Sequence, residues 1–322
     1  MNEFALIDRY FRRAVSDKAV QLGIGDDGAV VAPAPGCDLV FSVDMLVEGR
    51  HFLADVDPVT LGHKTLAVNL SDMAAMGAKP RWALLAGALP DFDEDWLRGF
   101  AQGLFALADR FGVALIGGDT TRGPRNLCLT IIGEVPAGTA MKRSGAKPSD
   151  DIYVSGTLGD AALALAMLQG AARVADADFA KARTRLETPE PRVALGERLR
   201  GVATAAVDVS DGLTGDLQHI LDSSGVGAAI DVAQIPRSQC LDAMLGGVAR
   251  AKGLACILGG GDDYELCFTA APASREAVTA IARGVDVSLT RIGSITAAPG
   301  LVVRDERGVP LPALPRSFDH FG

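Results

Sequence analysis

Aspartates beside glycines or at the ends of apolar runs are the residues of this 322-residue chain best suited to chemistry. They occur in six segments: Gly25-Asp26-Asp27-Gly28, Ser42-Val43-Asp44, Asn69-Leu70-Ser71-Asp72, Gly117-Gly118-Asp119-Thr120-Thr121, Asp208-Val209-Ser210-Asp211-Gly212 and Gly259-Gly260-Gly261-Asp262-Asp263. A single Asp-Gly pair is ordinary turn chemistry. Asp44, Asp119 and Asp208, however, end or follow apolar runs typical of buried strands, where an unpaired carboxylate costs free energy. Because well-placed basic residues are too few, we expect metal cations to compensate these charges.

The helix that we expect over residues 58–77 carries a narrow polar stripe on a mostly apolar surface. Thr65, Asn69 and Asp72 fall at positions i, i+4 and i+7, which share one helix face. The candidate ligands are all hard oxygen atoms, from carboxylates, Ser42 and main-chain carbonyls. Zinc is disfavoured because no His/Cys cluster exists, and the acids do not follow the spacing of a calcium-binding EF-hand. Magnesium, completed by substrate phosphates, fits best.

The segment Gly23-Ile24-Gly25-Asp26-Asp27-Gly28 matches the GxGxxG pattern of dinucleotide-binding sites, and Asp44 lies near the offset of a ribose-binding acid. That pattern requires a helix starting at the glycines, whose N-terminus receives the pyrophosphate. Pro33 and Pro35 exclude such a helix here, and the two aspartates would repel a pyrophosphate. The chain also lacks the P-loop and protein-kinase motifs. We therefore reject a nicotinamide oxidoreductase, which only observed NADH binding would revive.

Apolar periodicity and turn residues predict an irregular alternation of helices and strands. Helices are expected at 2–15, 58–77 with Asp57 as N-cap, 93–111 with Gly112 at its C-terminus, 161–168, 213–221, 238–252 and 273–283. Strands are expected at 38–44, 82–89, 113–116, 127–135, 152–155, 202–209, 228–232, 264–270 and 289–295. The turn-rich stretch 143–151 is the best boundary, so we expect an N-terminal domain at 1–145 and a C-terminal domain at 146–322. The irregular alternation favours α+β, or mixed α/β, domains over a doubly wound sheet.

The composition is that of a globular protein with 48% hydrophobic and 22% charged residues. A net charge of -9 leaves no basic excess for a nucleic-acid backbone. The five cysteines form no CxxC pair, so we expect buried, reduced thiols; they are Cys37, Cys128, Cys240, Cys256 and Cys267. The N-terminus lacks the features of a secretion signal, and no apolar run approaches the roughly 20 residues that span a bilayer. We expect a cytoplasmic protein with no membrane partner.

The motifs, taken in their order along the chain, resemble the thiamine-monophosphate kinase family. The matching segments are Gly23 to Asp27, Ser42 to Asp44, Gly49 to Phe52, Ala67 to Gly77, Leu115 to Pro124, Arg143 to Pro148, Val207 to Leu213, Gly261 to Leu266 and Phe318 to Phe321. The wider superfamily includes aminoimidazole ribonucleotide synthetase and selenophosphate synthetase. This resemblance implies an N-terminal domain that contributes to a β-barrel shared by a homodimer, and a C-terminal α/β domain that completes the nucleotide and substrate site.

The resemblance further implies that ATP and thiamine monophosphate give ADP and thiamine diphosphate, with several Mg²⁺ ions as cofactors and ATP as co-substrate. The implied metal ligands are Asp27, Ser42, Val43, Asp44, Asp72, Asp119, Asp208 and Asp211. The implied ATP contacts are Gly118, Asp119, Arg143 and Ser210. The implied thiamine-phosphate contacts are His51, Asp262 and Phe318.

Three positions depart from the usual family pattern. Val43 stands where threonine is frequent and can offer only its main-chain oxygen, whereas Asp262 stands where glutamate is usual. Phe318 replaces a more polar aromatic residue. Simpler roles stay open for Arg143 as a solvated turn residue, for Phe318 as a packing anchor and for Ser210 as the N-cap of the following helix.

The acceptor in this reaction would be a phosphate monoester, which needs no deprotonation, so no general base is expected. Asp44, Asp119 and Asp211 would act through Mg²⁺, and Arg143 would add fixed positive charge. In-line transfer without a phospho-enzyme is the hypothesis. Two alternatives remain: another ATP-dependent enzyme of the superfamily with a different acceptor, and a non-catalytic metal- or nucleotide-binding protein. A selenophosphate synthetase is disfavoured because no cysteine precedes Cys37.

Overall fold

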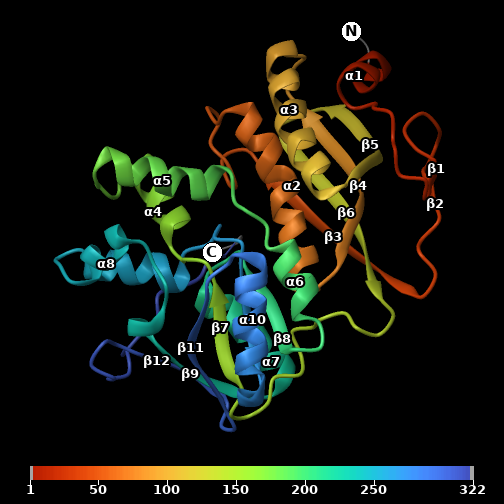
Figure 1. Ribbon diagram of the computed structural model, residues 1–322. Helices are drawn as coiled ribbons and strands as arrows, with labels where there is room; N and C mark the ends of the chain where they lie inside the picture. The colour runs from red at the N-terminus through yellow and green to blue at the C-terminus, as the bar shows by residue number, and fades with distance from the viewer. Residues whose placement is uncertain (1–2, 320–322) are drawn as a thin grey trace. The chain divides into compact units, whose positions relative to one another are not determined.

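The computed structural model describes residues 3–319, which form two compact units of mixed α/β structure (Figure 1). Among these residues, the first unit extends to residue 73 and continues from 78 to 138. The second unit contains residues 74–77 and the chain from residue 139 onward. The mixed α/β class expected from the sequence is confirmed, whereas the expected domain limits of 1–145 and 146–322 remain predictions.

The first unit is built on a four-stranded sheet with the strand order β3-β6-β4-β5. Its strands are β3 (Cys37–Val47), β4 (Lys79–Leu89), β5 (Ala114–Arg122) and β6 (Asn126–Pro136). β4 and β5 pair in parallel, and the other two pairings are antiparallel. A parallel pair requires a crossover connection, which α3 (Glu94–Phe111) provides. The remaining elements are α1 (Glu3–Tyr10), α2 (Pro58–Ala75), β1 (Val20–Leu22) and β2 (Val30–Val31).

Glycines let α2 and α3 pack with their backbones in contact, side by side in Figure 1. A Cβ atom at Gly103 would lie 1.8 Å from the carbonyl oxygen of Val59. One at Gly62 would lie 2.0 Å from the carbonyl oxygen of Phe100. Any side chain at these two positions would therefore force the helices apart, so the pair fixes how closely α2 approaches α3.

The helix ends of the first unit follow the capping residues in the sequence. Asp57 Oδ1 accepts a hydrogen bond from the Val59 N–H at 2.8 Å, ahead of Pro58 in the first helical position. Asp93 caps α3 through the N–H groups of its first turn. Gly112 ends α3 in the left-handed conformation, with φ of 66°. The two caps expected from the sequence, Asp57 and Gly112, are confirmed, and Asp93 is a third that was not predicted.

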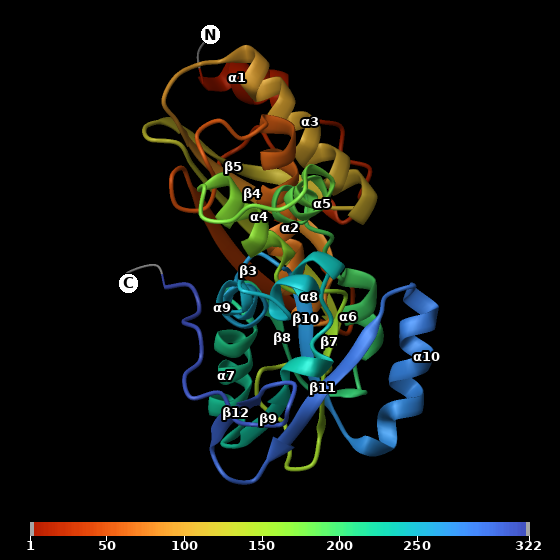
Figure 2. The same cartoon turned by 90° about the vertical axis from the view of Figure 1, so that its left-hand side faces the viewer.

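The second unit contains a six-stranded sheet with the order β12-β9-β11-β7-β10-β8. Its strands are β7 (Asp151–Ser155), β8 (Ala203–Val209), β9 (Gly227–Asp231), β10 (Glu265–Ala270), β11 (Leu289–Thr296) and β12 (Gly300–Arg304). The α-helices are α4 (Asp160–Leu168), α5 (Asp176–Glu187), α6 (Val193–Leu199), α7 (Leu213–Ser224), α8 (Gln239–Leu245), α9 (Arg250–Leu254) and α10 (Arg275–Val285). Figure 2 shows α7 and α10 on opposite sides of the sheet. The central strand β7 and its neighbour β10 are buried along their whole length.

Several elements differ from the sequence-based expectations. The opening helix is α1, which ends at Tyr10 instead of residue 15, and β3 continues to Val47. The helix expected at 238–252 is two helices, α8 and α9, because Gly246 and Gly247 interrupt it. Four features were not predicted from the sequence: α5, α6, β12 and the β1–β2 pair. α5 is rich in charged residues and buries only Ala182 and Leu186, so its apolar periodicity is weak.

Within residues 3–319, no helix combines the length and the apolarity needed to cross a membrane. All five cysteines are free thiols; Cys256 and Cys267 are buried, and the other three are partly buried. Burial raises the pKa of the Cys256 thiol to about 11. The expected burial is thus confirmed for two of the five, and their reduced state stays a prediction.

Asp151, at the start of β7, joins three elements of the second unit. Its carboxylate is 1% exposed and accepts hydrogen bonds from Arg275 Nε at 2.6 Å and Nη2 at 2.9 Å. Arg291 on β11 donates a further hydrogen bond through its Nε. The hydrogen bonds from Arg275 and Arg291 lower the pKa of Asp151 below its ordinary value. A buried carboxylate with these partners ties α10 and β11 to the central strand.

We predict that Asp151→Asn lowers the free energy of unfolding by about 2 kcal/mol at pH 7, because two guanidinium groups lose their charged partner. The folded-state pKa of Asp151 is depressed, so its contribution is present above the unfolded pKa of about 3.9 and is lost as the pH falls through the folded value. Urea unfolding at pH 7 and pH 3 should show the difference between variant and wild type shrinking at the lower pH. Asp95→Asn, in an exposed ion pair with Arg98, is the control and should unfold like wild type at pH 7. A difference for Asp151→Asn that does not change with pH would contradict the assignment.

Candidate active site

Ser42, Asp44 and Asp72 gather on the helix-covered side of the first unit's sheet. Ser42 Oγ on β3 donates a hydrogen bond to Asp72 Oδ2 on α2 at 2.5 Å. Asp44 shares the Ser42 face of β3, because alternate strand residues point the same way, and residues 40 and 46 of this face are buried. Val43 points to the opposite face and is 58% exposed. The structure thus joins Ser42 to Asp72 and leaves Val43 only its main chain for this side.

The expectation that Asp44 ends a buried strand is wrong. Asp44 lies in the middle of β3 and is half-buried. β3 is an edge strand, and its other face carries exposed apolar side chains, so the strand is not buried on both sides. The apolar run around Asp44 therefore reflects an open apolar face, and not a core strand.

Asn69 supplies a buried oxygen one helical turn before Asp72. Its side chain is 0% exposed, and its Nδ2 donates to the Thr65 carbonyl oxygen at 3.2 Å. Among the described residues, Asn69 Oδ1 has no hydrogen-bond partner. Because Asn69 and Asp72 are three residues apart, they share a face of α2. A buried, unsatisfied oxygen beside a carboxylate fits a hard cation or its bound water, so this donor set suits Mg²⁺.

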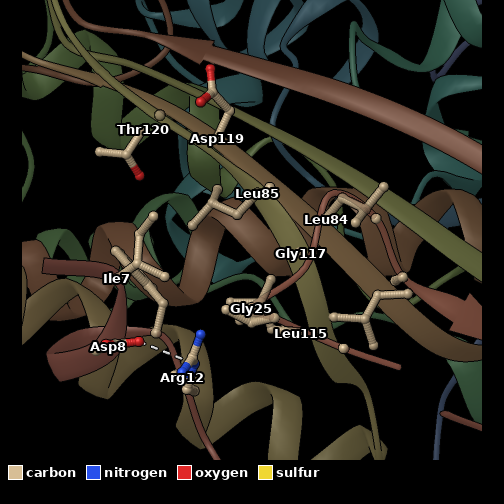
Figure 3. A pocket seen from close by; sticks show the side chains of 18 of the residues that line it. Ile7, Asp8, Arg12, Gly25, Leu84, Leu85, Leu115, Gly117, Asp119 and Thr120 are labelled. Carbon is tan, nitrogen blue, oxygen red and sulfur yellow. Dashed lines mark ion pairs between the residues drawn. The ribbon is translucent and has the colours of Figure 1, made fainter. Parts of the chain in front are cut away.

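A cavity of about 770 Å³ lies beside the glycine-rich segment of the first unit (Figure 3). Its walls come from α1, residues 23–29, β4, α3 and β5, and they are largely apolar. Asp27, Gly118 and Asp119 line it. The segment 23–28 forms no helix, which confirms the rejection of a dinucleotide-binding motif. The cavity thus places apolar surface next to three of the expected metal- and ATP-binding residues.

Arg12 provides positive charge at this cavity, against Gly25. It pairs with Asp8 at 3.1 Å, as Figure 3 shows. A Cβ atom at Gly25 would lie 2.5 Å from Arg12 Nη2, so the guanidinium rests directly on the glycine-rich segment. Arg12 was not predicted as a site residue, because only the fold brings the end of α1 to residues 23–28.

Asp119 also differs from its expected setting. It lies within β5, which continues to Arg122, and it is exposed, so it does not follow a buried strand. Gly118 has φ of 146°, and a Cβ atom there would lie 1.9 Å from the Leu85 carbonyl oxygen. Only glycine fits at residue 118. The close approach sets the path of the backbone into Asp119. Asp27 is likewise exposed.

His51 follows β3 in a turn. Its Nδ1 accepts a hydrogen bond from the Val47 N–H at 3.0 Å, which leaves the ring proton on Nε2 when the imidazole is neutral. The side chain is partly buried. His51 is thereby held in one orientation relative to the end of β3.

In the second unit, the loop after β8 carries Asp208, Ser210 and Asp211. Asp208 is buried at the end of β8, as expected from the sequence. Ser210 is not the N-cap of α7, because Gly212 holds that position without a side-chain cap. Instead, Asp216 Oδ2 accepts hydrogen bonds from the N–H groups of residues 210, 211 and 212, at 3.0, 3.1 and 3.1 Å. Burial raises the pKa of Asp216 to about 7 against these hydrogen bonds, and the charge of Asp211 adds to the rise.

Asp262 and Phe318 are bonded to the same loop through their main chains. The Asp262 N–H donates to the Ser210 carbonyl oxygen at 2.8 Å, and the Phe318 N–H donates to the Asp211 carbonyl oxygen at 3.0 Å. Tyr264 Oη donates to Asp262 Oδ1 at 2.9 Å. Asp262 and Tyr264 both have positive φ, 67° and 51°, an unusual conformation for residues with side chains. The structure therefore brings the expected substrate residues Asp262 and Phe318 together with Ser210 and Asp211.

Buried acids support the segment that carries Asp262. Asp263 accepts the Gly159 N–H with both carboxylate oxygens, at 3.0 and 2.9 Å, and its burial raises its pKa well above the ordinary value. Glu265 is 0% exposed and pairs with Arg185 at 2.7 Å and with Arg192 at 2.5 Å. These contacts fix the strained turn at its middle residue, Asp263, and directly after it, at Glu265.

Among the described residues, no hydrogen bond or ion pair joins the Arg143 side chain to this loop. It is exposed on the segment before β7, and its carbonyl oxygen accepts a hydrogen bond from Ser224 Oγ at 3.3 Å. Across residues 3–319, no three His, Cys, Asp or Glu side chains form a metal-binding group. The expected ligands divide between the units, with Asp208 and Asp211 in the second and the others in the first.

Comparison with known proteins gives the family. Residues 25–135 match the AIR synthase related protein N-terminal domain, and residues 147–306 match the corresponding C-terminal domain. The thiamine-monophosphate kinase of Salmonella typhimurium is 48% identical over 99% of this chain and 98% of its own length. That of Haemophilus influenzae is 39% identical over 100% of this chain and 98% of its own length.

Solved structures agree with these relatives. The thiamine-monophosphate kinase of Stenotrophomonas maltophilia K279a is 49% identical, with a TM-score of 0.86 over 97% of this chain and 98% of that one. The structure of AaThiL complexed with AMPPCP and TMP is 28% identical, with a TM-score of 0.78 over 99% and 97% of the two chains. Similarity of this extent, along the whole chain and in both domains, means that this protein belongs to the thiamine-monophosphate kinase family.

Proposed function

We propose that this chain is an ATP-dependent phosphotransferase that converts thiamine monophosphate and ATP into thiamine diphosphate and ADP. One observation carries the proposal: the loop with the candidate metal and ATP residues is hydrogen-bonded to both Asp262 and Phe318, the candidate substrate residues. The relatives named thiamine-monophosphate kinase support the reaction. The related structure with AMPPCP and TMP supports the substrates.

An oxygen of the thiamine phosphate would attack the γ-phosphorus of ATP while the bond from that phosphorus to the ADP oxygen breaks. The acceptor is already an anion, so no side chain needs to remove a proton. His51, Asp262 and Phe318 would bind the thiamine phosphate. Gly118, Asp119, Arg143 and Ser210 would bind ATP, and the guanidinium of Arg143 would oppose the charge of the phosphates.

The two substrates are polyanions that repel one another. Cations held by the acidic residues would lower this repulsion. When bound, Mg²⁺ would neutralise phosphate charge and orient the oxygens for in-line displacement. The residues that would hold it are Asp27, Ser42, Val43 through its main chain, Asp44, Asp72, Asp119, Asp208 and Asp211. Asn69 Oδ1 adds an unsatisfied oxygen to the group around Asp72. We propose direct transfer, without a phosphorylated side chain, because the phosphate oxygen of the acceptor is itself an ionised nucleophile.

The cavity of the first unit would receive the base of the nucleotide. Its largely apolar wall suits a purine ring, and its volume of about 770 Å³ falls in the range typical of small-molecule sites. Asp27, Gly118 and Asp119 on its wall would place phosphates and their cations at its margin. Arg12 would add a positive charge there.

A homodimer through the first unit's sheet would explain the open face of β3. Leu39, Phe41, Val43 and Met45 share that face and are 36%, 62%, 58% and 51% exposed. A contiguous row of exposed apolar side chains on an edge strand is typical of an interface. A second copy presenting the same face would close the two sheets into a shared barrel.

Free cysteines agree with a reducing compartment, and the cytoplasm is the proposed location.

The reaction predicts thiamine diphosphate, identified by mass, together with ADP release from wild-type protein, ATP, Mg²⁺ and thiamine monophosphate. Asp72→Asn should lower kcat/KM at least about 100-fold, because it removes one ligand charge and alters the partner of Ser42. Asp55→Asn, on an exposed turn, is the control and should react like wild type. If wild type binds ATP and Mg²⁺ but makes no product, the proposed reaction is wrong, and a screen of phosphorylated metabolites then distinguishes an enzyme with a different acceptor from a non-catalytic binding protein.

For the nucleotide cavity we predict that Gly87→Leu raises the KM for ATP about tenfold and leaves the KM for thiamine monophosphate nearly unchanged. Gly87 lines the cavity, and an added Cβ would have its nearest neighbour 3.9 Å away at Leu127, so the new side chain would occupy free space. Ala106→Leu, on the exposed side of α3, adds bulk outside the cavity. Steady-state kinetics with either substrate varied gives both constants. Unchanged ATP kinetics in a folded Gly87→Leu protein would exclude the cavity as the nucleotide site.

The dimer predicts that wild-type protein sediments as twice the chain mass and that Phe41→Asp sediments as a monomer at micromolar concentration. Placing a carboxylate in the middle of an apolar interface leaves a charge without a partner. Phe92→Asp changes an exposed phenylalanine outside β3 and should leave the dimer intact. Analytical ultracentrifugation distinguishes the species. A monomeric wild type, or a dimeric Phe41→Asp variant, would refute this interface.

A further inference from the structure

One carboxylate oxygen organises the loop between β8 and α7. Asp216 is 3% exposed, and its Oδ2 accepts three consecutive main-chain hydrogen bonds from residues 210–212, all within 3.1 Å. Three such bonds on one atom leave the peptide planes of the loop little freedom to rotate.

The carbonyl groups of the same loop hold the candidate substrate residues. Val209, Ser210 and Asp211 accept hydrogen bonds from the N–H groups of Tyr264, Asp262 and Phe318, at 2.8, 2.8 and 3.0 Å. A peptide plane fixed at its N–H side is also fixed at the preceding carbonyl, because the peptide bond is planar. The orientation that Asp216 imposes is therefore passed to the segments around Asp262 and Phe318.

Close backbone contacts also keep this loop from shifting relative to its neighbours. A Cβ atom at Gly261 would lie 2.3 Å from the Ser210 carbonyl oxygen, and one at Gly212 would lie 2.6 Å from the carbonyl carbon of Gly259. The C-terminal segment is held on the next turn of α7, where Thr214 Oγ1 lies 3.5 Å from Ser317 Oγ. Figure 2 shows the end of the chain running beside α7 and α9.

We propose that Asp216 is a positioning residue for phosphoryl transfer. It holds the loop so that the side chains of Ser210 and Asp211 and the main-chain partners of Asp262 and Phe318 keep one arrangement. Asp216 touches none of the reacting groups, since its three hydrogen bonds all go to the main chain. Removing it should disturb cation binding, ATP binding and thiamine-phosphate binding together. The predicted effects on ATP and thiamine phosphate rest on the proposed function. The predicted effect on cation binding does not.

The test compares Asp216→Asn with wild type in Mn²⁺ binding, measured by electron paramagnetic resonance without substrates, and in steady-state kinetics. Loss of a residue that orients ligands typically costs 10–100-fold, so we expect Mn²⁺ affinity to fall about tenfold and kcat/KM about 100-fold. The KM values for both substrates should rise. Asp305→Asn is the matched control, because that carboxylate also accepts two main-chain N–H groups, from Arg307 and Val309 at 2.9 Å, in a turn of the same unit. It should change none of these quantities by more than about twofold.

Asp216→Glu keeps the carboxyl group, lengthens the side chain by one methylene group and provides a second variant if the asparagine form does not fold. We expect it to weaken the same three quantities by smaller factors. Wild-type Mn²⁺ affinity and wild-type Michaelis constants in either folded variant, with only the melting temperature lowered, would overturn the proposal. If wild-type protein makes no thiamine diphosphate, the proposed function fails, and the Mn²⁺ comparison still decides the role of Asp216.

Discussion

Negative charge is the constraint on which the candidate active site depends. The chain carries a net charge of -9, the proposed ligands are almost all aspartates, and both proposed substrates are phosphates. Such groups repel one another unless cations or N–H dipoles lie between them. Buried acids of the second unit receive N–H partners, three at Asp216 and the Gly159 N–H at Asp263. For the rest, cations are the natural complement.

Main-chain hydrogen bonds do most of the positioning that this constraint requires. Aspartates cannot hold one another in place, because like charges repel, so each is set by the backbone on which it sits. Glycines allow that backbone to approach closely, as Gly118 does against Leu85 and Gly261 does against Ser210. The candidate residues thus sit on strands, on a helix and in short loops whose backbones are closely packed.

The sequence predicted what local chemistry determines. The caps Asp57 and Gly112 were predicted correctly, because a cap depends on its nearest neighbours. The polar stripe of α2 pointed to Asp72, and the structure places it against Ser42 from β3. The mixed α/β class also followed from the pattern of elements.

The remaining features depend on contacts between distant residues. Asp216 looked like an ordinary helix residue, and its three partners appear only once β8 and α7 are in place. Asp44 and Asp119 were expected at buried strand ends. The sequence pattern of an apolar run is the same whether its side chains face a core or an open sheet face. Arg12 lies against Gly25 only because of the fold. A single sequence gives no sign of such juxtapositions.

The central claim is direct transfer between two phosphate-bearing substrates, without a base or a phosphorylated side chain. The most direct test uses ATP made chiral at the γ-phosphorus with three oxygen isotopes and determines the configuration of the transferred group in thiamine diphosphate. A single in-line displacement predicts inversion at phosphorus. Retention would require two successive transfers through a phospho-enzyme and would contradict the account.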